Sequence, residues 1–193
     1  MKQIRLNAIL TGCAAIGLAI SPASAVSSEP TKAGAKATDR SPNRAVSELR
    51  HVIGDWNVIT DFISAEGEVY TAPGQYSFRW IIQDKVVSGT AITPKLKQKS
   101  AILFFHRSDK KEIEMASVGA DGHLWRMIGP ENNETRTTPN IVRPDGSQTM
   151  LRFTRSDVAP NSFKSMMELS DDGGETWRIA NRQKFTRRQD GDS

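Results

Sequence analysis

The chain has 193 residues, enough for one domain of ordinary size, and 37% of them are hydrophobic. Its 26 basic and 22 acidic residues give a net charge of +4, and this near balance of signs argues against a nucleic-acid partner. A single cysteine, Cys13, excludes an internal disulfide framework and a metal site built from several cysteines.

The first 25 residues have the pattern of a secretory signal peptide. Lys2 and Arg5 form a positive start, residues 9–20 form an apolar run too short to span a bilayer stably, and Ala25 closes a small-residue cleavage motif. We therefore expect cleavage after Ala25 and a periplasmic or secreted protein. Removal of Lys2 and Arg5 leaves 24 basic and 22 acidic residues out of the original 26 and 22.

A lipoprotein is the alternative interpretation of the same segment. Leu10-Thr11-Gly12-Cys13 resembles a bacterial lipobox, which would make Cys13 a lipidated first residue. The apolar run continues past Cys13, where a lipoprotein would turn polar. The sequence therefore favours the cleaved form without stable membrane insertion.

Composition divides the rest of the chain. Residues 26–43 are rich in Ser, Thr, Ala, Lys and Pro and are predicted to be a flexible linker. Residues 44–188 form the predicted domain, and residues 189–193 a disordered tail. The domain begins with a short amphipathic helix, in which Ala45, Leu49 and Val52 share one face. We expect this helix to plug or flank one end of the fold.

After the helix the hydrophobic period is two, which is typical of half-buried strands. Residues 75–83 alternate most regularly, and further strand candidates are 56–63, 86–93, 101–106, 111–118, 123–128, 148–154, 163–169 and 176–186. Turn signals such as Asp121-Gly122 separate them. The pattern predicts an all-β fold, an antiparallel up-and-down calycin-like or lipocalin-like barrel of about 8–10 strands with a short N-terminal helix. A β-sandwich is the alternative topology.

Residues 101–105 are apolar on both faces, whereas a barrel wall needs only one apolar face. We expect the second face, which carries Ile102 and Phe104, to lie under the helix or in a homodimer contact.

Gly54-Asp55-Trp56 lies at the entry to the strands, and Ser170 to Trp177 reads as a closing hairpin followed by a strand that ends in basic residues. Together these motifs resemble the calycin superfamily, and more closely an uncharacterised, often secreted, bacterial calycin-like family. The resemblance covers about residues 44–188. It implies a barrel closed near Trp56, with Arg187 or Arg188 over the indole. It brings no activity and no catalytic residues.

The closing hairpin also fits the Asp-box pattern S-x-D-x-G-x-x-W, known from sialidase propellers. Ser170 and Asp172 can bind turn amides, Gly174 supplies positive φ, and Trp177 packs beneath the turn. We interpret the box, together with Gly54 and Trp56, as structural. One copy in a chain too short for a propeller argues against a sialidase.

A barrel of this size has room for side chains and one small molecule. We predict non-covalent binding of a largely apolar ligand, because aromatic side chains and Met suit such a guest. The candidate ligand-binding residues are Tyr76, Phe78, Trp80, Phe105, Trp125 and Met167. A hydrolase or isomerase that uses a carboxylate or histidine in the barrel, and an envelope assembly module, are the alternatives.

No catalytic residue, metal site or cofactor is predicted. The histidines, His51, His106 and His123, lack metal-pair spacing. Haem held by one histidine is not favoured, because related haem barrels place it in the last strands and residues 177–185 contain none. Lysines alternate at 95, 97 and 99 and recur at 110 and 111, which is compatible with solvated loop tips or with an anionic membrane or polymer.

Overall fold

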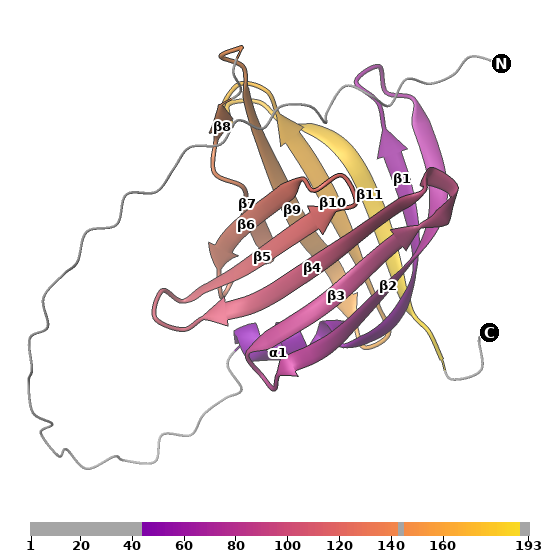
Figure 1. Ribbon diagram of the computed structural model, residues 1–193, viewed down its shortest axis with the longest axis vertical. Coiled ribbons are helices and arrows are strands. Elements are labelled where there is room, and N and C mark those ends of the chain that lie inside the picture. The colour runs from indigo at the N-terminus through magenta and orange to yellow at the C-terminus, as the bar shows by residue number, and fades with distance from the viewer. Residues whose placement is uncertain (1–43, 143–144, 190–193) are drawn as a thin grey trace, which may run out of the picture. The chain divides into compact units, whose positions relative to one another are not determined.

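The computed structural model describes residues 44–142 and 145–189, which form a closed antiparallel β-barrel with a short helix at one end (Figure 1). This confirms the predicted all-β, up-and-down barrel. The predicted signal peptide and linker, and residues 190–193 of the predicted tail, lie outside the described residues. Within the described ranges no helix is long and apolar enough to cross a membrane.

The elements follow one another along the chain with short connections. They are α1 (Arg44–Val52), β1 (Gly54–Ile63), β2 (Val69–Ile82), β3 (Val86–Thr93), the 3-10 turn η1 (Pro94–Leu96), β4 (Gln98–Arg107), β5 (Glu112–Gly119), β6 (Leu124–Pro130), β7 (Thr135–Thr137), β8 (Ile141–Val142), β9 (Gln148–Ala159), β10 (Ser162–Ser170) and β11 (Arg178–Arg187).

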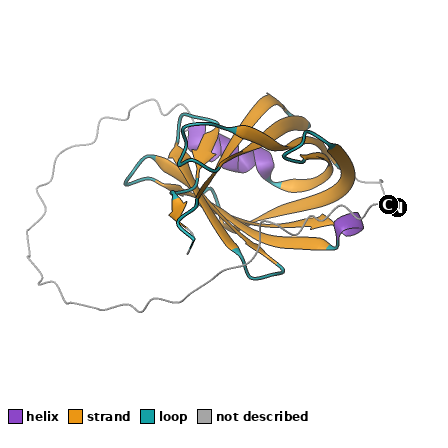
Figure 2. Ribbon diagram, turned by 90° about the horizontal axis from the view of Figure 1, so that it is seen from above, coloured by secondary structure: helices purple, strands orange, loops and turns teal. Residues whose placement is uncertain are grey.

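Ten of these strands close into a ring. Neighbours in sequence pair from β1 to β7, β7 pairs with β9, and β9, β10 and β11 follow in order. The antiparallel pairing of β1 with β11 completes the circle, and β8 pairs with β9 outside it. Figure 2, turned by 90°, shows the strands curving around with α1 within their outline. Because the ring is closed, the sheet has no open edge along β1 or β11.

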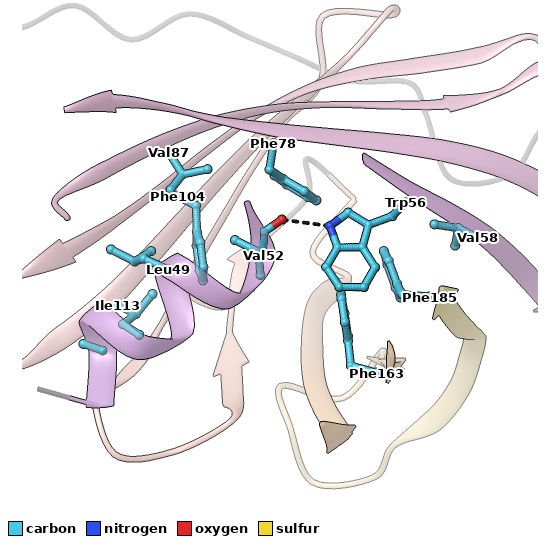
Figure 3. Packing of buried hydrophobic residues seen from close by; sticks show 11 residues of the cluster. Leu49, Val52, Trp56, Val58, Phe78, Val87, Phe104, Ile113, Phe163 and Phe185 are labelled. Carbon is cyan, nitrogen blue, oxygen red and sulfur yellow. Dashed lines mark hydrogen bonds between the residues drawn. The ribbon is translucent and has the colours of Figure 1, made fainter. Parts of the chain in front are cut away.

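The apolar face of α1 closes one end of the barrel, as the helix pattern predicted. Ala45 and Leu49 are fully buried, and they belong to one core cluster with Val87, Phe104 and Ile113 (Figure 3). The helix therefore fills the end of the barrel where β3, β4 and β5 supply inward-facing side chains.

The face of β4 that carries Ile102 and Phe104 lies under the helix, as one of the two expectations had it, but it is the inner face of the barrel and not the outer one. Phe104 belongs to the core cluster and Ile102 packs against it, so both side chains face inward. Phe105 alternates with them and pairs with Glu114, whose carboxylate binds the exposed Arg126 on the outer face. Phe105 therefore faces outward and does not line the interior. The helix covers the inward face of β4. Because residues 101–105 are apolar on both faces, the sequence pattern alone does not determine which face of the strand points inward.

Candidate functional site

The end of the barrel next to α1 is filled with aromatic side chains. Trp56 is fully buried, its indole N–H donates to the carbonyl of Val52 at 2.8 Å, and its ring meets Phe163 edge-on with centroids 5.0 Å apart. Phe163 stacks on Phe185 at 4.1 Å. The Arg187 guanidinium lies 4.2 Å from the centre of the Trp56 ring. The barrel closes at Trp56 as the resemblance implied, with Arg187 in the expected place.

Gly54 is the position where the chain turns from α1 into β1. Its φ of +126° is a conformation that L side chains rarely adopt. A Cβ atom there would lie 2.5 Å from Arg187 Nη1. The glycine therefore makes room for the arginine that covers the tryptophan.

A buried charged cluster joins α1 to the wall. Glu48 accepts a hydrogen bond from Arg136 at 2.5 Å, and the side chain of Arg136 is fully buried over the ring of Phe104. Arg155 binds Glu134 at 2.8 Å. Burial raises the pKa of the Glu48 carboxyl against the opposing effect of Arg136. The cluster fixes the position of the helix, and nothing in the sequence pattern indicated it, because its members lie up to 107 positions apart, from Glu48 to Arg155.

The half of the barrel away from α1 has a different interior. Near α1 the inward-facing residues are mostly buried; further along, several inward-facing residues are partly exposed, whereas Thr60, Ala72, Ser165 and Leu169 are buried. Solvent therefore reaches part of the inner wall in this half of the barrel. We call it the open half, and its partly exposed inner residues include Ser117, Trp125, Phe153, Met167, Asn181 and Gln183. Tyr76 and Ile102 are also partly exposed, but they pack against the core cluster.

A polar cluster lies on this inner wall. The Gln183 side-chain amide donates to the hydroxyl of Tyr76 at 2.9 Å and to that of Thr60 at 3.1 Å, and its oxygen accepts from Ser165 at 3.0 Å. Burial raises the pKa of the Tyr76 phenol, which keeps the hydroxyl protonated. The cluster joins β1, β2, β10 and β11, and together with Ser117 and Asn181 it makes the inner wall partly polar.

The predicted ligand-binding residues fall into three places. Trp125 and Met167 lie on the inner wall of the open half, whereas Tyr76 packs against the core cluster at its border and meets Phe185 edge-on. Phe78 is buried in the core cluster near α1, and Trp80 packs against that cluster, so both contribute to the filled end. Phe105 lies outside the barrel. The hydrogen-bonding members, Thr60, Ser165 and Gln183, were missed because each is a lone polar residue at an inward position of an otherwise mixed strand.

The Asp-box forms the predicted hairpin between β10 and β11. Ser170 Oγ accepts from the amide of Gly174 at 2.8 Å, and Asp172 accepts from the amide of Thr176 at 2.9 Å. The Trp177 indole donates to the carbonyl of Gly174 at 3.0 Å. These bonds hold the pKa of the Asp172 carboxyl far below its usual value. The polar groups are engaged within the turn, which matches the structural interpretation.

The histidines are engaged by other side chains. His106 contacts Glu131 at 2.7 Å, and His123 packs on Trp125 with ring centres 4.7 Å apart. His51 bonds the carbonyl of Ala159 at 2.8 Å. Among residues 44–142 and 145–189 no group of three or more His, Cys, Asp or Glu side chains is arranged to hold a metal ion.

No protein-family model matches the chain, and the search of curated proteins found no match. Among solved structures it is similar to EF1p2_mFAP2b bound to DFHBI, with 11% identity over 76% of this chain and 100% of that one and a TM-score of 0.39. It is also similar to the S-type phycobiliprotein lyase CPES from Guillardia theta, with 8% identity over 74% and 92% and a TM-score of 0.42. A redesigned β-barrel, b11L5F_LGL, matches with 17% identity over 76% and 96% and a TM-score of 0.32. Because these TM-scores are low, the similarities carry no information about the function of this chain.

Proposed function

We propose that the protein is a secreted or periplasmic, lipocalin-like barrel that binds one small, largely apolar molecule without covalent chemistry. The observation that carries the proposal is the contrast between the two halves of the barrel. Trp125, Phe153 and Met167 are partly exposed on the inner wall of the open half, while the other half is filled by the core. Small-molecule sites are typically apolar concavities with a few convergent polar groups.

The polar cluster supports one further property of the ligand. A protonated Tyr76 beside Gln183 and Thr60 offers hydrogen bonds at one place on the inner wall. A guest with one polar group and an apolar body matches this distribution. Burial works against a phenolate at Tyr76, so the cluster favours binding over general-base catalysis, and no specific observation favours the enzyme alternative.

The proposed location rests on the sequence of the first 25 residues, with cleavage after Ala25. Membership of the uncharacterised bacterial calycin-like family is part of the same proposal. It is supported by the places of Trp56 at the closed end and of the Asp-box before the last strand.

Native mass spectrometry of the protein exported to a bacterial periplasm and purified without detergent tests the proposal. We expect a discrete additional mass that leaves on denaturation. The variant Met167→Trp, which enlarges an inward-facing side chain in the open half, should lose this mass. Met166→Trp is the matched control, because Met166 is the adjacent methionine on the outer face of β10 and pairs with exposed Arg182.

Binding of a fluorescent apolar dye, 1-anilinonaphthalene-8-sulfonate, provides a second measurement on the same variants. We expect Met167→Trp to weaken dye binding at least tenfold relative to Met166→Trp, which corresponds to about 1.4 kcal/mol. Equal binding by the two variants, together with a bare polypeptide mass for the unaltered protein, would overturn the proposal.

A further inference from the structure

The outer surface of the barrel carries a continuous apolar patch over β4, β5 and β6. Ala101 of β4 pairs with Val118 of β5, which pairs with Leu124 of β6, and all three side chains are exposed. Leu103 and Phe105 continue the outer face of β4. The exposed fractions of Leu103, Val118 and Leu124 are 37%, 40% and 59%. We call these five residues the β4 patch.

Unpaired lysines flank the β4 patch at both ends of its strands. Lys97 and Lys99 lie where η1 leads into β4, and Lys110 and Lys111 lie in the turn between β4 and β5. All four are exposed, and none forms an ion pair with another residue of ranges 44–142 and 145–189. Contiguous apolar surface rimmed by polar residues is typical of interaction sites.

The acidic side chain beside the patch is already neutralised. Glu114, next to Phe105 across the β4–β5 pair, binds Arg126 and also contacts Arg107 at 3.4 Å. These arginines hold the pKa of the Glu114 carboxyl below its usual value, with the Arg126 hydrogen bond as the largest cause. Asp109 and Glu112 adjoin Lys110 and Lys111 in the turn between β4 and β5, so the excess of positive charge beside the patch lies at its Lys97 and Lys99 end.

The net positive charge of the protein is concentrated in the segment that carries the β4 patch. Residues 85–126, which carry the patch and its flanks, hold eight basic and four acidic residues, a net charge of +4 that equals the net charge of the full chain. Because residues 1–25 carry +2 from Lys2 and Arg5, the remainder of the chain is left with −2. The barrel thus has one basic side, formed by β3, β4 and β5, which face the viewer in Figure 1.

We propose that this side docks onto an anionic lipid bilayer, with the β4 patch in the interface and the flanking lysines on the lipid headgroups. Apolar surface and basic flanks together match a negatively charged interface with an apolar layer beneath it. A second copy of the chain fits less well. A two-fold dimer through this face would bring the basic flanks of the two copies close together, and like charges repel. The proposal does not depend on ligand binding in the open half.

Co-sedimentation of the purified protein with vesicles tests the docking. We expect binding to vesicles that contain phosphatidylglycerol, little binding to pure phosphatidylcholine vesicles, and loss of binding as salt rises toward 1 M. The charge reversals Lys97→Glu and Lys99→Glu should each weaken binding by roughly tenfold, because each basic residue near an anionic surface contributes about fivefold and reversal adds repulsion. Lys184→Glu on exposed β11 is the control and should bind like the unaltered protein.

The apolar contribution is tested with Leu103→Glu against Ile59→Glu, an exposed isoleucine (47%) on the outer face of β1. Both replace an exposed side chain, and equal urea midpoints establish that both variants fold. Only Leu103→Glu should lose vesicle binding. Equal binding to neutral and anionic vesicles, or no binding to either, would overturn the proposal. Self-association in analytical ultracentrifugation that Leu103→Glu abolishes, without vesicle binding, would instead identify a dimer interface.

Discussion

Arg187 joins the last strand of the barrel to the end of the helix. Its guanidinium covers the Trp56 ring and donates to the carbonyls of His51 and Ile53 at 2.8 and 2.5 Å. These carbonyls lie at and just after the end of α1, where helical hydrogen bonds run out. One side chain therefore satisfies the helix end and seals the closed end of the barrel at the same time.

We expect Arg187→Ala to lower the free energy of unfolding by about 2–3 kcal/mol, because charged hydrogen bonds and a cation–π contact are lost together. Urea denaturation measures this loss. Arg182→Ala, on the exposed outer face of the same strand, should stay within about 0.5 kcal/mol of the unaltered protein. Equal losses in the two variants would contradict the role assigned to Arg187.

His51 gives the protein a dependence on pH. Its Nε2 faces the Ala159 carbonyl, which can only accept, so Nε2 carries the hydrogen, and Nδ1 faces Arg155 at 3.4 Å. Burial, followed by the charge of Arg155, lowers the pKa of the imidazole although the carbonyl contact opposes this. The unfolded chain therefore takes up a proton at His51 more readily than the folded protein does.

Stability should consequently fall as the pH drops below about 6.5, the ordinary value for histidine, and level off below the folded-state value. Unfolding free energies measured at pH 7.5 and pH 5 should differ less in His51→Gln than in the unaltered protein. A pH dependence that is unchanged in His51→Gln would count against this assignment.

The Asp-box hairpin is an element whose sequence determines its local structure. Asp172 accepts hydrogen bonds from both the amide and the hydroxyl of Thr176, and Ser170 donates to it at 2.7 Å. Because the partners lie within six residues of one another, the motif could be predicted without knowledge of the rest of the fold.

We expect Asp172→Ala to speed amide hydrogen exchange at Thr176 by more than tenfold, because the acceptor of that amide is lost. Asp171→Ala is the matched control, since the neighbouring aspartate makes a 3.5 Å contact with Arg178 in an exposed position. Comparable protection of the Thr176 amide in both variants would show that the turn holds without the box.

Elements whose form depends on distant partners were predicted less well. β2 begins at Val69, whereas the sequence analysis recognised regular alternation only from residue 75; Pro73 and Gly74 lie in the part of the strand that was missed. Pairing with β1 along its whole length keeps this segment extended. At Gly74 a Cβ atom would lie 2.8 Å from the carbonyl oxygen of Ile92, so the glycine permits a close approach to β3.

At the scale of the whole molecule, the barrel divides into a filled end and an open half. The helix, Trp56 and the buried Glu48–Arg136 pair belong to the filled end. Hydrophobic alternation predicted the ring of strands and the helix at its end. How far each part of the interior is filled depends on which inward side chains meet across the barrel. That explains why Phe78 is buried in the core whereas Tyr76, two residues earlier on the same face, is partly exposed at the border of the core.

The pairing of Trp56 with Arg187 also bears on how the molecule forms. β1 cannot pair with β11 until nearly the whole domain has been synthesised, because β11 ends at Arg187. Pairing between strands that lie so far apart in the sequence makes folding slow. Until the ring closes, both β1 and β10 present open edges. A chain that stops before β11 should therefore aggregate, because the edges of β1 and β10 stay unpaired.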